Sequence, residues 1–274
     1  MGLVINMKEI IKLVLVDIDG TLLDSNHRVS QRTVEAISKL EEHGILFGIA
    51  TGRTPFAVRH LVSDWNIAQY TDLIMGFNGG CTLNMKNNQL DSCYLLDGKY
   101  IREIKEDFKA FKINMALYDE ESCHALWEDE RVLGISKGNK IEFVVDDLTG
   151  YETKQINKLL FVGTKEQIDE CEAYYNEHIH TSHYRAVRST PTLLEFLNPD
   201  LSKSKGIEVI CDHLGITMEN VLTFGDELND LEMIRDCVGV AMGNANPKIK
   251  EIARYITDSN NDSGIATFLE ENIL

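Results

Sequence analysis

Short apolar runs alternate with amphipathic segments along the first third of the chain. The apolar runs predict buried strands at residues 11–16, 45–50 and 73–77. The segments between them repeat their apolar residues every three or four positions and predict helices at 30–43 and 55–65. Ser30 can cap the first helix, and Gly44 suits the left-handed residue that ends one. Strands that alternate with helices in this way predict a mainly parallel sheet.

The pattern changes after residue 81 and returns near residue 190. Between these points the chain mixes amphipathic strands with polar helices, at 99–112, 114–118, 158–162 and 165–178. Buried strands and helices then alternate again, at 193–197, 203–214, 221–224, 228–236 and 238–242, before a last helix that ends near residue 269. We therefore expect a doubly wound α/β core of residues 1–81 and 190–274, interrupted by an inserted α+β domain of residues 82–189.

Composition and charge narrow the choice of partners. Of the 274 residues, 43% are hydrophobic and 26% charged, which is typical of a folded globular protein. Asp and Glu number 44 against 27 Lys and Arg, so the formal net charge is −17. Such a charge repels nucleic acid and anionic membrane surfaces, and we expect neither as a partner. An anionic substrate would need a local cation, either a metal ion or a buried lysine.

The six cysteines are scattered along the chain and form no C-x-x-C pair. This spacing gives no sign of a zinc site or a redox dithiol, and it favours reduced thiols in a cytoplasmic protein. No apolar run is long enough to span a bilayer. His178, His180 and His183 could share one face of a strand, but nothing completes a metal-ligand set, so we expect them on a polar surface.

A pair of carboxylates follows the first predicted strand. Asp17 and Asp19 stand in the run Asp-Ile-Asp-Gly-Thr, and side chains two positions apart point the same way on an extended chain. Gly20 permits a sharp turn directly after them. One carboxylate could attack a substrate while the other moves a proton. At the carboxyl end of a buried strand, where open parallel sheets bind ligands, this pattern indicates a catalytic site.

Three further elements carry groups suited to phosphate chemistry. Thr51-Gly52-Arg53 ends the second strand, and a threonine hydroxyl with the adjacent backbone N–H can hold a phosphoryl group. Arg53 suits either a substrate contact or a surface ion pair. Lys203 and Lys205 compete for the role of the cation that neutralises phosphate. The acidic run 225–230 follows another buried strand, and it could cap a helix as well as bind a metal ion.

Together these motifs resemble those of the haloacid dehalogenase (HAD) superfamily of phosphohydrolases, in particular its Cof-type branch with a large C2-type cap. The resemblance extends over nearly the whole chain, and it includes the Asn-Gly-Gly turn at 78–80 and the segment 240–245. It implies a Rossmann-like core with a doubly wound, mainly parallel sheet and an inserted α+β cap.

The resemblance also implies roles for individual residues. Asp17 would be the nucleophile and Asp19 the general acid and base, with Thr51 and Lys203 at the phosphoryl group. The family's lysine stands three residues before the glycine that matches Gly206, which favours Lys203. Lys205 stays an alternative. Mg²⁺ would be bound by the side chains of Asp17 and Asp226 and the backbone carbonyl of Asp19, with metal-bound water oriented by Asp230. The implied substrate contacts are those of Thr51, Gly52, Arg53, Lys203 and Asn229.

We therefore expect a Mg²⁺-dependent phosphatase that acts as a monomer or homodimer. Its substrates would be small phosphorylated metabolites, such as sugar phosphates or nucleotide-type cofactors, hydrolysed through an aspartyl-phosphate intermediate. A phosphomutase with the same nucleophile is one alternative, and a non-catalytic sensor of phosphate ligands is another.

Overall fold

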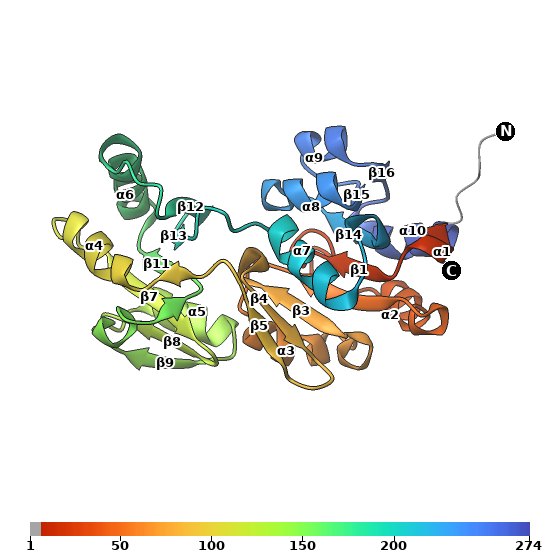
Figure 1. Ribbon diagram of the computed structural model, residues 1–274, viewed down its shortest axis with the longest axis horizontal. Helices are drawn as coiled ribbons and strands as arrows, with labels where there is room; N and C mark the ends of the chain where they lie inside the picture. Colours follow the sequence, from red (N-terminus) through yellow and green to blue (C-terminus); the bar gives the residue numbers. More distant parts are fainter. Residues whose placement is uncertain (1–6) are drawn as a thin grey trace. The chain divides into compact units, whose positions relative to one another are not determined.

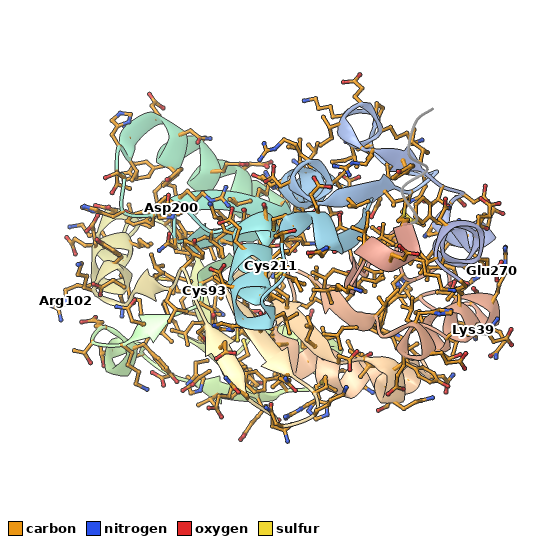
Figure 2. The ribbon with its side chains drawn as sticks, turned by 45° about the vertical axis from the view of Figure 1, so that its right-hand side comes forward. Lys39, Cys93, Arg102, Asp200, Cys211 and Glu270 are labelled. Carbon is orange, nitrogen blue, oxygen red and sulfur yellow. The ribbon has the colours of Figure 1, made fainter. Side chains whose placement is uncertain are left out.

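The computed structural model describes residues 7–274, which form two compact units (Figure 1). Unit 1 comprises residues 7–93 and 202–274, and unit 2 comprises residues 94–201. Cys93 and Asp200, labelled in Figure 2, lie beside the two places where the chain passes from one unit to the other. Unit 2 is therefore inserted into unit 1.

Unit 1 is built on an eight-stranded sheet with the order β16-β15-β14-β1-β2-β3-β4-β5. The strands are β1 (Leu13–Val16), β2 (Leu46–Ala50), β3 (Leu73–Gly76), β4 (Cys81–Asn84), β5 (Leu90–Ser92), β14 (Val221–Gly225), β15 (Val238–Ala241) and β16 (Tyr255–Ile256). Six of them, from β16 to β3, run parallel, and β4 and β5 add antiparallel pairs at one edge. The central strand β1 is buried along its whole length, as expected for a parallel sheet covered on both faces.

Helices connect these strands. They are α1 (Met7–Ile10), α2 (Gln31–Ser38), α3 (Pro55–Asp64), α7 (Lys203–Leu214), α8 (Leu231–Asp236), α9 (Pro247–Ile252) and α10 (Gly264–Asn272). The Ser30 hydroxyl accepts a hydrogen bond from the backbone N–H of Thr33 and so caps α2 as predicted. Gly44 adopts the left-handed conformation with φ 67°, after a short 3₁₀ turn that ends the helical segment.

Unit 2 has a six-stranded sheet with the order β12-β13-β11-β7-β8-β9. Its strands are β7 (Asn114–Asp119), β8 (Ser122–Ala125), β9 (Glu142–Val145), β11 (Leu159–Val162), β12 (Arg185–Thr190) and β13 (Leu193–Leu197), and a small ribbon joins β6 (Leu96–Asp97) to β10 (Gln155–Ile156). The helices are α4 (Lys99–Asp107), α5 (Glu130–Gly138) and α6 (Lys165–His178). Every pair in the six-stranded sheet is antiparallel except β8 with β9.

In residues 7–274 we find no helix both long and apolar enough to cross a membrane.

The unit boundaries differ from those expected at residues 82 and 189. The hairpin of β4 and β5 stays in unit 1, because β4 pairs with β3 and β5 pairs with β4. The strand at 193–197, which we expected in the core sheet, is β13 and pairs with β11 and β12 in unit 2. Both junctions therefore lie further along the chain than predicted.

Candidate active site

Three neighbouring parallel strands bring the predicted motifs to one edge of the sheet. Strand β1 lies between β2 and β14, and all three run in the same direction. Asp17 follows β1, Thr51 follows β2 and Asp226 follows β14. The carboxyl ends of parallel strands are the usual ligand site of an open α/β sheet.

A buried lysine lies at the centre of this edge. The Nζ atom of Lys203, at the start of α7, lies 2.5 Å from Asp17 Oδ1 and 2.6 Å from Asp230 Oδ1. The Lys203 and Asp230 side chains are completely buried, and that of Asp17 is 9% exposed. The Ser202 hydroxyl caps α7 by accepting a hydrogen bond from the backbone N–H of Lys205, so α7 begins where Lys203 can reach both acids.

The loop after β14 orients the other two acids. Asp230 Oδ2 accepts hydrogen bonds from the backbone N–H groups of Asp226 and Glu227, at 3.0 and 3.2 Å. The Thr21 hydroxyl donates to Asp226 Oδ1 at 2.8 Å. Gly20 adopts φ +84°, and a Cβ atom there would lie 2.3 Å from Asp226 Oδ2. Glycine is therefore required for the close approach of these two loops.

Burial changes the proton affinities of these groups. It raises the pKa of Asp17 to about 7, although the nearby Lys203 opposes the shift. It also raises the pKa of Asp226 to about 6, while the hydrogen bond from Thr21 acts in the opposite direction. Burial alone would lower the pKa of Lys203, but Asp17 and Asp230 raise it above its usual value, so Lys203 carries a positive charge.

The donor set fits a hard divalent cation. Asp17, Asp226 and Asp230 each offer a carboxylate oxygen, and these oxygens lie within 4.8 Å of one another. They form the sole such cluster among residues 7–274. Three carboxylates face one ammonium group, which leaves two negative charges unmatched when all are ionised. Carboxylate oxygens are the ligands that Mg²⁺ prefers. Asp230 already accepts bonds on both of its oxygens, so Asp17 and Asp226 are the better candidate ligands.

Asp19 lies outside the buried cluster. Its side chain is 55% exposed and forms a two-pronged ion pair with Arg53, whose Nη2 atom lies 2.8 Å from Asp19 Oδ1 and whose Nε atom lies 3.2 Å from Oδ2. Thr51 is buried, and its hydroxyl accepts a hydrogen bond from the backbone N–H of Arg53. Gly52 lies half-buried between them. This is the ion pair that we considered for Arg53, and a substrate contact of Arg53 stays a prediction.

The alternative lysine, Lys205, and one predicted substrate contact, Asn229, do not join the cluster. The Lys205 side chain is 45% exposed and forms an ion pair with Glu208 at 2.7 Å, so Lys203 is the lysine that faces the acids. Asn229 is exposed in the 3₁₀ turn Leu228–Asp230, and no hydrogen bond among residues 7–274 joins its side chain to the acids. Thr21 was missed as a site residue, although it completes the motif that begins at Asp17.

Comparisons with known proteins identify the family. The model for haloacid dehalogenase-like hydrolases matches residues 14–269. A relative from Haemophilus influenzae is 31% identical over 95% of this chain and 97% of its own. The 5-amino-6-(5-phospho-D-ribitylamino)uracil phosphatase YitU of Bacillus subtilis is 27% identical over 94% of this chain and 96% of its own. The crystal structure of a haloacid dehalogenase-like hydrolase from Bacteroides thetaiotaomicron matches with a TM-score of 0.85 at 27% identity, over 95% of this chain and 99% of that one.

The chain therefore belongs to the haloacid dehalogenase-like hydrolases. It is a hydrolase of phosphomonoesters, with the mainly parallel α/β core of that superfamily. Membership among these enzymes sets aside the non-catalytic sensor that we considered as an alternative.

Proposed function

We propose that the protein is a Mg²⁺-dependent phosphatase of small phosphorylated metabolites that works through an aspartyl-phosphate on Asp17. The observation that carries this proposal is the contact of buried Lys203 with Asp17 and Asp230, beside the third carboxylate of Asp226. A carboxylate fixed next to a permanent positive charge can approach an anionic phosphoryl group.

In the first step, an oxygen of Asp17 attacks phosphorus while the bond to the leaving oxygen breaks. The carboxyl group of Asp19 donates its proton to that oxygen, which leaves as an alcohol. Arg53 contacts both oxygens of Asp19, so this ion pair must open before Asp19 can reach a substrate. The Thr51 hydroxyl and the backbone N–H of Gly52 would hold the transferring group.

In the second step, the carboxylate of Asp19 takes a proton from water, and the resulting hydroxide attacks phosphorus. The bond between phosphorus and Asp17 breaks, which frees inorganic phosphate and restores the Asp17 carboxylate. Asp17, Asp226 and the backbone carbonyl of Asp19 would hold Mg²⁺, which shields the phosphoryl charge when bound. Asp230 keeps Lys203 and the loop after β14 in place.

Small phosphomonoesters are the proposed substrates because the relative YitU is named for a phosphorylated ribitylaminouracil. Six unpaired cysteine thiols support a cytoplasmic location. The test is a panel of sugar phosphates and nucleotide-type cofactors, assayed for free phosphate with and without Mg²⁺. We expect release that depends on Mg²⁺ and is absent in Asp17→Asn. A phosphomutase would instead yield an isomerised sugar phosphate without free phosphate, which product analysis detects.

A further inference from the structure

The loop after β3 has an unusual backbone. Phe77 and Asn78 are consecutive non-glycine residues in the left-handed region, with φ 51° and 57°. This conformation is uncommon for residues with side chains, and such strain is concentrated at functional sites. It persists here because neighbouring groups fix the loop.

Two segments of the candidate active site hold the loop. The backbone N–H of Phe77 donates to the carbonyl of Arg53, and that of Asn78 donates to the carbonyl of Thr51, each at 2.9 Å. On the other side, a Cβ atom on Gly79 would lie 2.4 Å from the carbonyl oxygen of Ser202, the residue that caps α7. The loop therefore lies between Thr51 and the start of α7, the helix that carries Lys203, and contacts both.

The Asn78 side chain lies in this fixed loop without a partner. Its Oδ1 atom is buried and makes no hydrogen bond, and its Nδ2 atom donates none within the part of the chain that the structure describes. A Cβ atom on Gly52 would lie 3.2 Å from Oδ1 and 3.3 Å from Nδ2, so the amide lies directly against Gly52. A buried polar atom without a partner is unusual in a native protein. Oδ1 is an acceptor, so the group of this amide that can bind an anion is its free Nδ2–H, which is a donor.

We propose that Asn78 is a phosphate-binding residue whose amide N–H donates to an oxygen of the phosphoryl group held at Thr51 and Gly52. The proposal rests on the proposed phosphatase function. The Nζ atom of Lys203 contacts Asp17 and Asp230, so phosphoryl oxygens on the side of Thr51 can take hydrogen bonds from other donors. An amide fixed against Gly52 provides one, and the strained loop holds it in place before substrate arrives.

The competing explanation is that asparagine is present because it tolerates a left-handed backbone. The variant Asn78→Gly distinguishes this explanation from phosphate binding, because glycine adopts the left-handed conformation freely but lacks the amide. Asn78→Asp keeps the side-chain shape and replaces the donor with an acceptor. Asn66→Gly is the matched control, because Asn66 is also left-handed, with φ 58°, and is exposed just after α3.

The experiment measures the dissociation constant of inorganic phosphate by calorimetry in Mg²⁺, and kcat and KM for 4-nitrophenyl phosphate. Hydrogen bonds to charged groups are strong enough that Asn78→Gly should weaken phosphate binding on the order of tenfold. Asn78→Asp should weaken it further by repulsion, and Asn66→Gly should stay within about twofold of the wild type. Melting curves identify any variant that fails to fold. If one Asn78 variant fails to fold, the phosphate affinity of the other Asn78 variant tests the proposal.

Equal phosphate affinity in Asn78→Gly and Asn66→Gly, with active wild type, would overturn the role of Asn78 alone. Wild-type protein that neither binds phosphate nor hydrolyses the aryl ester would contradict the phosphatase proposal itself. The two failures are therefore distinguishable.

Discussion

Each unit of the molecule buries a lysine, and the two lysines differ in their surroundings. In unit 2, Lys158 Nζ lies 2.9 Å from Glu195 Oε2, and both side chains are at most 7% exposed. In unit 1, Lys203 faces two carboxylates, with Asp226 as a third acid in the same cluster. The pair in unit 2 matches one positive charge with one negative charge, whereas the cluster in unit 1 has an excess of negative charge. Such an excess is costly unless protons or a cation neutralise it.

The two sheets explain where this difference arises. The parallel strands of unit 1 end at a common edge, so the loops after β1, β2 and β14 converge and bring their polar residues together. In the mainly antiparallel sheet of unit 2, neighbouring strands end at opposite edges. Glu195 lies within β13 rather than after it. The buried charge of Glu195 pairs inside the sheet, whereas the charges of unit 1 collect at the edge where open α/β sheets usually bind ligands.

The largest expected effect comes from removing the lysine of unit 1. Lys203→Ala should lower kcat by about 10³-fold, because a fixed charge at the phosphoryl group is lost and Asp17 and Asp230 are left facing each other. Lys205→Ala, which removes an exposed ion pair, should change kcat less than about tenfold. Steady-state kinetics on one aryl phosphate compare the two variants. The opposite ranking would show that Lys205 is the phosphate-binding lysine.

Metal removal tests the excess negative charge directly. Chelation should abolish hydrolysis, and Mg²⁺ should restore it while Ca²⁺, which coordinates more loosely, restores it poorly. Mg²⁺ at 100 times its dissociation constant should stabilise the wild type by about 2.7 kcal/mol, observed as a rise in Tm. Asp226→Ala should lose both the activity and the rise in Tm. Full activity in excess chelator would rule out the metal site.

The buried pair of unit 2 should respond differently. Lys158→Met leaves Glu195 as an unpaired buried charge and should lower the free energy of unfolding by about 3–5 kcal/mol. The double variant Lys158→Met, Glu195→Leu should recover most of that loss, because no buried charge remains. Thermal unfolding of single and double variants measures the difference. If the double variant were no more stable than Lys158→Met, the unpaired charge of Glu195 could not be the cause of the lost stability.

Several features could be predicted from the sequence because they depend on local pattern. Buried strands followed by Asp17, Thr51 and Asp226 indicated both the sheet and the edge that carries the site. The junctions of the inserted unit could not be predicted in this way. Strand β13 is nearly as buried and apolar as a core strand, and only its partners β11 and β12 assign it to unit 2.

The directions of the side chains could not be predicted from the sequence either. The spacing of Asp17 and Asp19 predicted two carboxylates that point the same way, yet Asp17 is buried and Asp19 is exposed beside Arg53. The chain leaves the extended conformation after β1, so alternation along a strand no longer applies. The left-handed loop at Phe77 and Asn78 also depends on segments distant in sequence, because Asn78 bonds to Thr51 and the next residue, Gly79, lies close to Ser202.

The smallest expected effect is a dependence of metal binding on pH. The pKa of Asp17 is raised to about 7 and that of Asp226 to about 6. Between about pH 4 and these values, each carboxyl group is more protonated in the folded, metal-free protein than in the unfolded chain. These groups therefore lower stability as pH rises from about 4 to 7. Mg²⁺ needs ionised ligands, so its binding should release between one and two protons at pH 6 and almost none at pH 8. Calorimetry in buffers of different ionisation enthalpy counts these protons, and an equal count at both pH values would contradict the assignment.

The covalent intermediate on Asp17 is the central claim, and intact-mass measurement after rapid mixing with an activated aryl phosphate tests it most directly. In Asp19→Asn, Asp17 can still attack a substrate with a good leaving group, but no carboxylate remains to activate water. This variant should accumulate one phosphoryl group per chain, and Asp17→Asn should accumulate none. An adduct on Asp17→Asn, or wild-type turnover in Asp19→Asn, would contradict the proposed roles of the two aspartates.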